Sequence, residues 1–171
     1  MLIFINKPSW RNARKISKAI RIHNQKNPNM LERMPKDIKK SDFWIAQNEY
    51  FKILGFIGIF SWGEDGVEIV SHLTLEKFRD LGVGEKLLEY AMTEARKISS
   101  KIFLFTTEIE YYEKFRFEVV EAEKFPEKIR VRCQNCPNGP FGPGFSPCLE
   151  KAMEQKVKPS ESNTWMFPYF G

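Results

Sequence analysis

The sequence has few cysteines, few histidines and no long apolar stretch. Its 171 residues include three cysteines and two histidines, and an odd number of cysteines argues against a secreted disulfide scaffold. Residues 53–60 form the longest apolar run, but two glycines interrupt it and it falls far short of the ~20 residues of a membrane helix. We therefore expect a cytoplasmic protein without a membrane partner.

A strong excess of either charge is also missing. The chain carries 27 Lys and Arg against 22 Asp and Glu, a net charge of +5, and no basic stripe stands out. We therefore expect no nucleic-acid partner, whereas a mildly positive surface suits a small anionic ligand. The 42% hydrophobic content indicates a packed core, and the length suits one compact domain.

The order of predicted elements defines the fold class. Apolar periodicity and turn signals predict helices at residues 9–27, 35–40, 84–98 and 108–115, and strands at 1–5, 43–46, 53–62, 67–75, 101–106 and 117–120. Hairpin-linked strands followed by αβ units predict an α+β fold with a mixed, mostly antiparallel central sheet flanked by helices. A further helix is predicted near residues 147–156.

Residues 79–84, Arg-Asp-Leu-Gly-Val-Gly, lie between a predicted strand and a predicted amphipathic helix. The two glycines allow close approach of a ligand, and the start of the helix offers unpaired N–H groups to a pyrophosphate. Arg79 would add positive charge at its edge. A tight turn needs similar residues, so both interpretations stay open. A P-loop is excluded because no Gly-Lys-Ser/Thr follows, and the strand order disfavours a dinucleotide fold.

Two motifs together resemble the GNAT superfamily of acetyltransferases. The first is the strand at 67–75 followed by Arg79-x-x-Gly82-x-Gly84 and a helix with paired leucines; the second is Tyr-Tyr-Glu-Lys-Phe-Arg-Phe-Glu-Val-Val at 111–120. Arg116 stands where the superfamily usually has glycine, which predicts a strained or reshaped turn. The resemblance covers about residues 43–120. It implies an N-acetyltransferase that moves an acetyl group from acetyl-CoA to a primary amine.

The same resemblance implies a set of cofactor-binding residues. A splayed strand would contact the pantetheine arm and polarise the thioester carbonyl through its backbone, and the loop and helix start would bind the pyrophosphate. These residues are Leu73, Thr74, Leu75, Arg79, Asp80, Leu81, Gly82, Val83, Gly84 and Glu85.

Two side chains are the candidates for catalysis. Glu68 lies 11 residues before Arg79, where some GNAT enzymes place a general base; a surface carboxylate is the alternative. Simple alternation puts His72 on the same face of the strand as Glu68. His72 could relay a proton, or it could be a packed or exposed residue without a catalytic role. Tyr112 matches the tyrosine that protonates the departing thiolate in the superfamily, and a phenol suits that task. Tyr111 is predicted to be a core residue.

The C-terminal stretch, residues 133–171, is predicted to be an extension of a domain that spans residues 1–132. Its cysteines, Cys133, Cys136 and Cys148, could bind zinc, stay buried thiols or form a disulfide, and we assign no metal. The apolar segment 164–170 is expected to pack on its own domain or on a second subunit, which would make a homodimer.

A looser resemblance links the chain to short N-acetylglutamate-synthase-like proteins. It rests on Phe-Pro-Glu-Lys-Ile at 125–129, Cys-x-x-Cys-Pro at 133–137 and Cys-x-Glu-x-Ala-Met at 148–153. It implies glutamate or another amino acid as the acceptor, with Arg33 binding its carboxylate. Leu75-Glu76 replaces the usual His-Pro, and residues 138–147 are an insertion. The alternatives are a peptide or protein amine as acceptor, or a non-catalytic CoA-binding regulatory protein.

Overall fold

The structure is a computed structural model and describes residues 1–27, 30–129 and 151–155. The helices are α1 (Trp10–Lys26), α2 (Pro35–Lys40), α3 (Val83–Arg96) and α4 (Ile109–Glu113). The strands are β1 (Phe4–Asn6), β2 (Asp42–Gln47), β3 (Ile53–Ser61), β4 (Val67–Thr74), β5 (Ile102–Thr106), β6 (Phe117–Val120) and β7 (Lys151–Gln155). Short 3₁₀ turns lie at Gly63–Asp65, Glu76–Phe78 and Ala122–Lys124.

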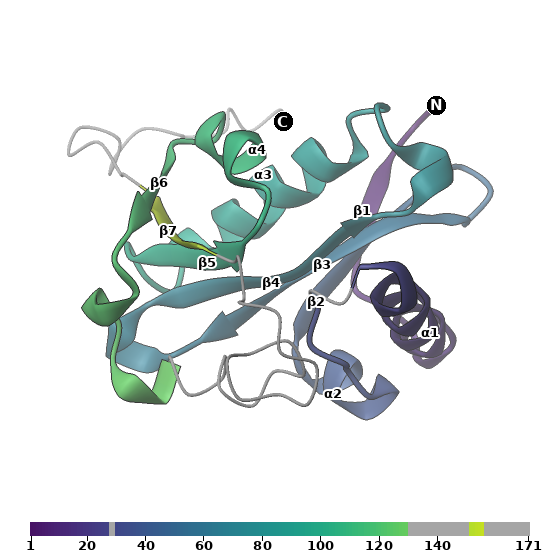
Figure 1. The fold of residues 1–171 in the computed structure, drawn as a ribbon. Helices are drawn as coiled ribbons and strands as arrows, with labels where there is room; N and C mark the ends of the chain where they lie inside the picture. Colours follow the sequence, from purple (N-terminus) through teal and green to yellow (C-terminus); the bar gives the residue numbers. More distant parts are fainter. Residues whose placement is uncertain (28–29, 130–150, 156–171) are drawn as a thin grey trace, which may run out of the picture.

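The seven described strands form one sheet in the order β1-β2-β3-β4-β5-β7-β6. Among these strands only β4 and β5 are parallel, and all other neighbours are antiparallel. Figure 1 shows α3 and α4 over one face of the sheet and α1 and α2 over the other. The prediction of a mixed, mostly antiparallel α+β sheet with flanking helices is confirmed.

Helix α1 forms where its sequence predicts it. The Ser9 hydroxyl caps the helix by accepting a hydrogen bond from the Asn12 N–H at 3.2 Å, which satisfies one of the donors that a helix start leaves free. Ala13, Ile16 and Ile20 recur at i, i+3 and i+7 and are buried with Phe43 of β2. The apolar stripe thus fixes which face of α1 lies on the sheet.

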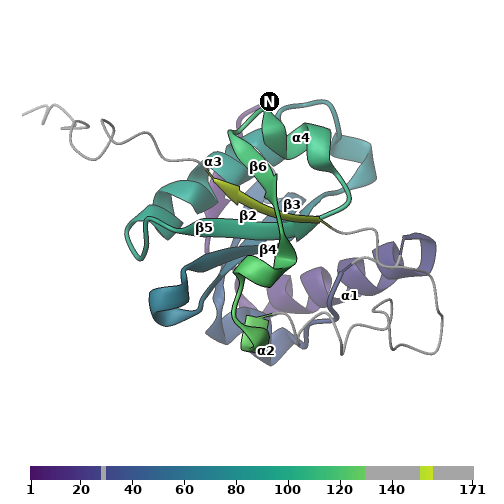
Figure 2. The same ribbon diagram turned by 60° about the vertical axis from the view of Figure 1, so that its left-hand side comes forward.

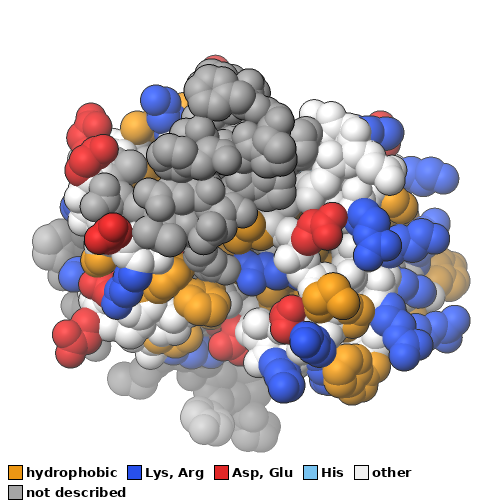
Figure 3. Space-filling view, turned by 60° about the horizontal axis from the view of Figure 1, so that its bottom comes forward, with side chains coloured by type: hydrophobic (Ala, Val, Ile, Leu, Met, Phe, Trp, Pro, Cys, Tyr) orange, Lys and Arg blue, Asp and Glu red, His pale blue; other side chains and the backbone are white. Residues whose placement is uncertain are grey.

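The outer face of α1 is strongly basic, a feature that the whole-chain charge conceals. Residues 10–40 contain ten Lys and Arg against two acidic residues, a net charge of +8, whereas the rest of the chain has 17 basic and 20 acidic residues. Helical spacing gathers Arg11, Arg14, Lys18 and Arg21 on the exposed side of α1, and Figure 3 shows the cluster of Lys and Arg side chains. The expectation that no basic stripe exists was therefore wrong.

A bulge in β4 changes which way its side chains point. Val70 lies opposite Gly58 of β3, but Leu73 lies opposite Phe56, so β4 holds one residue more than β3 over this stretch. Ser71 at the bulge has a φ of 51°. Val70 packs with the α1 side of the core, whereas His72, two residues later, contacts α3 and α4 on the other side. The prediction that His72 shares a face with Glu68 was wrong, because alternation breaks at a bulge.

The predicted helix near residues 147–156 is wrong for the residues that the structure describes there. Residues 151–155 form β7, which pairs with β5 on one side and β6 on the other (Figure 2). Ala152, Met153 and Gln155 are buried. Lys, Ala, Met, Glu and Gln all favour helices, but a backbone paired on both sides overrides that preference.

Several predictions fall on residues outside the described ranges. The three cysteines and the apolar segment 164–170 belong to these. Within the described residues, no group of three or more His, Cys, Asp or Glu side chains could hold a metal ion. None of the described helices is long and apolar enough to cross a membrane.

We expect Met153→Ala to destabilise the protein markedly, because β7 is part of the folded sheet. Met153 is fully buried in the same core cluster as Leu104 of β5 and Phe117 of β6, and such a truncation costs about 2–4 kcal/mol in the free energy of unfolding. Urea denaturation measures this change. Lys151→Ala, at an exposed position of the same strand, is the control and should shift the free energy by less than about 0.5 kcal/mol.

Candidate active site

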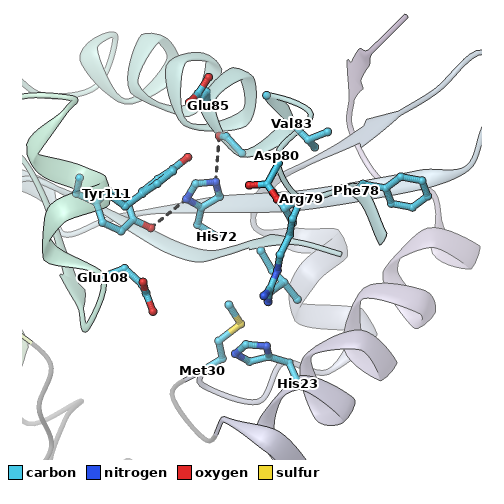
Figure 4. A pocket seen from close by; sticks show the side chains of 15 residues that line it. His23, Met30, His72, Phe78, Arg79, Asp80, Val83, Glu85, Glu108 and Tyr111 are labelled. Carbon is cyan, nitrogen blue, oxygen red and sulfur yellow. Dashed lines mark hydrogen bonds between the residues drawn. The ribbon is translucent and has the colours of Figure 1, made fainter. Parts of the chain in front are cut away.

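A cavity of about 480 Å³ opens between β4, the start of α3 and α4 (Figure 4). Nine residues that the sequence analysis selected line it, namely Leu73, Thr74, Arg79, Asp80, Gly82, Val83, Gly84, Glu85 and Tyr112. Six further residues complete the lining: His23, Met30, His72, Phe78, Glu108 and Tyr111. One wall is therefore a strand, and a second is the start of a helix.

The strand wall exists because β4 leaves its parallel neighbour early. The pairing of β4 with β5 covers only Val67 and Glu68. Further along, the Leu75 N–H donates to the Leu54 carbonyl at 2.9 Å on the β3 side. Because backbone groups alternate in direction along a strand, the N–H and C=O of Thr74 point to the other side, into the gap. The gap therefore offers backbone donors and acceptors to an extended ligand.

The loop before α3 turns a row of backbone N–H groups toward the cavity. Asp80 and Gly82 both have left-handed backbones, with φ values of 60° and 71°. Helix α3 begins without a side-chain cap from Gly82, so the N–H groups of Val83, Gly84 and Glu85 have no partner within the helix. Such a helix start, together with its dipole, favours phosphate oxygens.

Gly84 is required by close packing rather than by its backbone angle. A Cβ at this position would lie 2.9 Å from the Tyr111 hydroxyl oxygen and 3.1 Å from Thr74 Oγ1. The Tyr111 hydroxyl is buried and has no hydrogen-bond partner among the described residues. Burial raises the pKa of Tyr111 to about 12, with Glu85 and Glu89 adding to the effect. Tyr111 therefore places a neutral hydroxyl, without a hydrogen-bond partner among the described residues, beside the start of α3.

His72 and Tyr112 form a hydrogen-bonded pair on the α4 side of the cavity. His72 Nδ1 lies 3.0 Å from the Tyr112 hydroxyl, and His72 Nε2 lies 3.1 Å from the Gly84 carbonyl oxygen (Figure 4). A carbonyl can only accept, so the geometry assigns the proton to Nε2. Nδ1 then accepts the hydroxyl proton of Tyr112.

Burial keeps both partners of this pair neutral. Desolvation lowers the pKa of His72 to about 4, although the hydrogen bond to Gly84 opposes the change. Burial also raises the pKa of the Tyr112 phenol well above its usual range, with smaller contributions from Tyr111 and Glu108. At neutral pH the pair thus holds one imidazole proton and one phenol proton, and no net charge.

Four of the selected residues do not line the cavity: Glu68, Leu75, Leu81 and Arg33. Glu68 is buried at the start of β4, where its Oε2 accepts a hydrogen bond from Trp62 Nε1 at 2.9 Å. It lies two residues before Val70 and thus on the α1 side of the sheet. Leu81 is 52% exposed. The prediction for Glu68 as a base is therefore not supported by proximity to Tyr112.

The part of the cavity lining that comes from α1 and the segment after it was not predicted from the sequence. His23 comes from the last turns of α1, and Met30 follows that helix. Asn24 holds Met30 in place, because its Nδ2 donates to the Met30 carbonyl at 2.7 Å and its Oδ1 accepts from the Met30 N–H at 3.2 Å. In Figure 4 the Arg79 side chain points toward Met30 and His23. No local spacing signals contacts between segments so far apart in the sequence.

Arg116, which stands in place of a usual glycine, adopts a left-handed backbone with a φ of 64°. Its N–H donates to the Glu113 carbonyl at 2.9 Å, so the turn keeps its hydrogen bond despite the side chain. The predicted strain is present, because this region costs a non-glycine residue roughly 1–2 kcal/mol.

Comparison with known proteins agrees with the fold and identifies the family. Residues 39–119 match the family described as "Acetyltransferase (GNAT) domain". An uncharacterized N-acetyltransferase of Chlorobaculum tepidum is 30% identical over 111 residues, which cover 63% of this chain and 71% of the relative. The chain belongs to the GNAT acetyltransferase family and is an N-acetyltransferase. Members of this family use acyl-CoA.

Solved structures share the fold at low identity. N-acetylglutamate synthase of Neisseria gonorrhoeae, complexed with coenzyme A and N-acetyl-glutamate, matches with a TM-score of 0.73 and 19% identity. The match covers 91% of this chain but only 35% of the Neisseria chain. Rv2747 of Mycobacterium tuberculosis, in complex with CoA and a second ligand, matches with a TM-score of 0.71 and 15% identity over 91% of this chain and 99% of its own.

We expect Gly84→Ala to abolish CoA binding, because the new methyl group meets the Tyr111 hydroxyl and Thr74. The added Tyr111→Phe change removes one of the two clashing oxygens and should restore part of the affinity. Isothermal titration with CoA measures both variants. Gly63→Ala is the control: its methyl meets no atom within 4 Å, and although its φ of 67° adds backbone strain, CoA binding should be unchanged. A Gly84→Ala variant that binds CoA normally would contradict the packing argument.

The stability of the protein should decrease as the pH falls from about 6.5 to about 4. The folded protein holds His72 neutral down to a pKa of about 4, whereas the unfolded chain binds a proton near 6.5. Unfolding then takes up a proton, so acid favours it by up to roughly 3 kcal/mol. Urea midpoints measured across this range test the effect. His72→Gln should flatten the dependence, and His23→Gln should not.

Proposed function

We propose that this enzyme transfers the acetyl group of acetyl-CoA to the amino group of a small acceptor that carries a carboxylate, such as glutamate or another amino acid. The observation that carries the proposal is the position of Arg79. It lines the cavity and points toward Met30 and His23, away from the start of α3 (Figure 4). A guanidinium there is placed to bind a carboxylate at the acceptor end.

The residues around the cavity fit acetyl-CoA. The N–H groups at the start of α3 would hold the pyrophosphate, and the Thr74 backbone would pair with the pantetheine arm. The buried, unpartnered Tyr111 hydroxyl and the glycine that makes room for it are features that a ligand at this place would explain. When bound, acetyl-CoA supplies an activated acetyl thioester.

This chain's own groups then have separate tasks. A backbone N–H of the 73–75 segment polarises the thioester carbonyl. The Tyr112 hydroxyl gives its proton to the departing thiolate; burial keeps this phenol protonated at neutral pH.

Two carboxylates compete for the role of proton acceptor for the amine. Glu108 lines the cavity and is held at the start of α4, where its N–H donates to Thr106 Oγ1 at 2.9 Å. Glu68 lies on the α1 side of the sheet and could act only through water. The geometry therefore favours Glu108, and Glu68 stays the second candidate.

The surrounding charge supports an anionic acceptor. The acceptor end of the cavity contains His23 of α1, the helix whose outer face carries Arg14, Lys18 and Arg21. These three side chains form no ion pair with any described residue, so their field is not cancelled locally. Such a surface attracts carboxylates and repels polyamines. Arg33 lies outside the cavity lining, on the segment after Met30, and is proposed as a further carboxylate partner only for an acceptor that extends beyond the cavity.

The neighbours in structure point to the same class of acceptor. The Neisseria N-acetylglutamate synthase was solved with coenzyme A and N-acetyl-glutamate. Since identity to that protein is 19%, it supports the class of substrate only as an analogy.

We expect acetyl-CoA turnover with glutamate or another amino acid and little with spermidine or putrescine. Release of CoA, followed with a thiol reagent, measures a panel of amines that includes a short peptide. Binding of acetyl-CoA without turnover for any amine would overturn the enzyme proposal and favour a regulatory CoA-binding protein. Turnover confined to the peptide would overturn the amino-acid acceptor alone.

We expect Tyr112→Phe to lower kcat by roughly 100-fold, because it removes the proton donor, while CoA still binds. Glu108→Gln and Glu68→Gln form a matched pair for the proton acceptor. The variant with the larger loss of kcat identifies the base, and the geometry predicts that this is Glu108→Gln. Equal, small effects of both would show that neither carboxylate takes the proton.

We expect Arg79→Gln to raise KM for the amino-acid acceptor by roughly 10- to 100-fold, the worth of a charge-assisted hydrogen bond. The Kd for CoA should change little, because the pyrophosphate is assigned to backbone N–H groups. Steady-state kinetics and CoA titration separate the two effects. Lys77→Gln, an exposed cation in the preceding turn, is the control. A variant that loses CoA affinity instead would place Arg79 at the phosphates.

A further inference from the structure

The imidazole of His72 joins three parts of the cavity wall. His72 belongs to β4, its Nδ1 contacts Tyr112 of α4 at 3.0 Å, and its Nε2 contacts the Gly84 carbonyl in the first turn of α3 at 3.1 Å. Figure 4 shows the ring between the two walls with both hydrogen bonds drawn. The bulge at Ser71 is what turns this side chain to the α3 side of the sheet.

We propose that His72 is a positioning residue for acetyl transfer, which holds the Tyr112 hydroxyl in one place and one orientation through Nδ1 and ties it to the start of α3 through Nε2. The inference rests on the proposed role of Tyr112 as the proton donor. It explains why an imidazole packs against the rings of Tyr111 and Tyr112 at this position of β4.

The direction of the two His72 hydrogen bonds determines which way the Tyr112 hydroxyl proton points before the reaction. The Gly84 carbonyl cannot donate, so Nε2 carries the imidazole proton and Nδ1 accepts the proton of Tyr112. Before reaction the phenol therefore turns its lone pairs, rather than its proton, to the cavity. Its O–H bond turns away from Nδ1 only when charge develops on the sulfur.

The step balances within the site. The O–H bond of Tyr112 breaks and an S–H bond forms on the leaving thiolate. The acceptor nitrogen loses one proton to the carboxylate proposed above as the amide bond forms, and exchange with solvent then returns a proton to the phenol. His72 keeps its own proton on Nε2 throughout, so it acts on the phenol by placement and not by changing its charge.

A purely structural role is the rival explanation, because the Nε2 contact also fixes α3 against β4. Two substitutions separate the roles. His72→Gln can place an amide nitrogen near the Nε2 site and keep the donor to Gly84, but it offers nothing at Nδ1. His72→Asn can place an amide oxygen near the Nδ1 site and keep the acceptor for Tyr112, but it does not reach Gly84.

Kinetics of these two variants decide between the roles. We expect His72→Gln to lower kcat by roughly 10- to 100-fold with less than a threefold change in the Kd for CoA, and His72→Asn to retain more of the kcat. In a Tyr112→Phe background, His72→Gln should lower kcat by less than about threefold further, since both act on one proton. Retained kcat in His72→Gln, or additive losses with Tyr112→Phe, would overturn the proposal.

The resting tautomer can be read without any acceptor. The chain has two histidines, so ¹⁵N-labelled imidazole spectra of the full chain contain two ring systems, and His23→Gln assigns them. We expect a neutral ring with the proton on Nε2 for His72 at pH 7. A proton on Nδ1, or a cationic ring, would overturn the orientation of Tyr112. This measurement needs no turnover. It therefore tests the orientation of Tyr112 even if no amine substrate is found.

Discussion

The separation of β4 from β5 is the constraint on which the rest of the site depends. The two strands pair only at Val67 and Glu68, and three residues later the Ser71 bulge inserts an extra residue against β3. Parallel pairing there would have consumed the Thr74 backbone and filled the gap. Leaving these backbone groups unpaired costs free energy in the empty protein, and an extended ligand with amide groups can recover it.

The walls of the gap differ in charge and polarity. This difference suits a reaction between a charged cofactor and an amine. The start of α3 presents N–H groups and the positive end of a helix dipole. The α4 side presents neutral His72 and Tyr112, kept uncharged by burial. The α1 side adds cationic residues at its rim. A phosphate, a thioester and a carboxylate would thus each find a matching environment along one path.

Much of the fold could be predicted from the sequence because its signals are local. The Ser9 cap, the apolar spacing in α1 and α3, and the two glycines at the start of α3 all act within a few residues of themselves. The loop before α3 and Tyr112, which both line the cavity, were selected in the same way, through motifs of fixed spacing. Each of these motifs covers one continuous stretch of backbone within the site.

What escaped prediction depends on contacts that are distant in sequence or on a break in regularity. Residues 151–155 prefer a helix locally, yet they become β7 because β5 and β6 offer them backbone partners on both sides. The His72 side chain was assigned to the wrong face because one bulged residue reverses a period-two pattern. His23 and Met30 carry no signal at all, since their meeting with Arg79 arises only from the packing of α1 on the sheet.

The bulge that reverses the predicted face of His72 also brings its ring to the Tyr112 hydroxyl. Without the extra residue, regular alternation would turn the His72 ring toward the α1 side, where Val70 packs with Phe43 and Phe56. The Tyr112 hydroxyl would then lose its acceptor, and a buried hydroxyl without a partner costs roughly 1–3 kcal/mol. The Gly84 carbonyl would still bond within α3, so the main loss falls on the phenol. The irregular turn at Ser71 therefore lies at the place in β4 where it turns the His72 ring to the Tyr112 hydroxyl, and a strand with ideal alternation would not give that hydroxyl its acceptor.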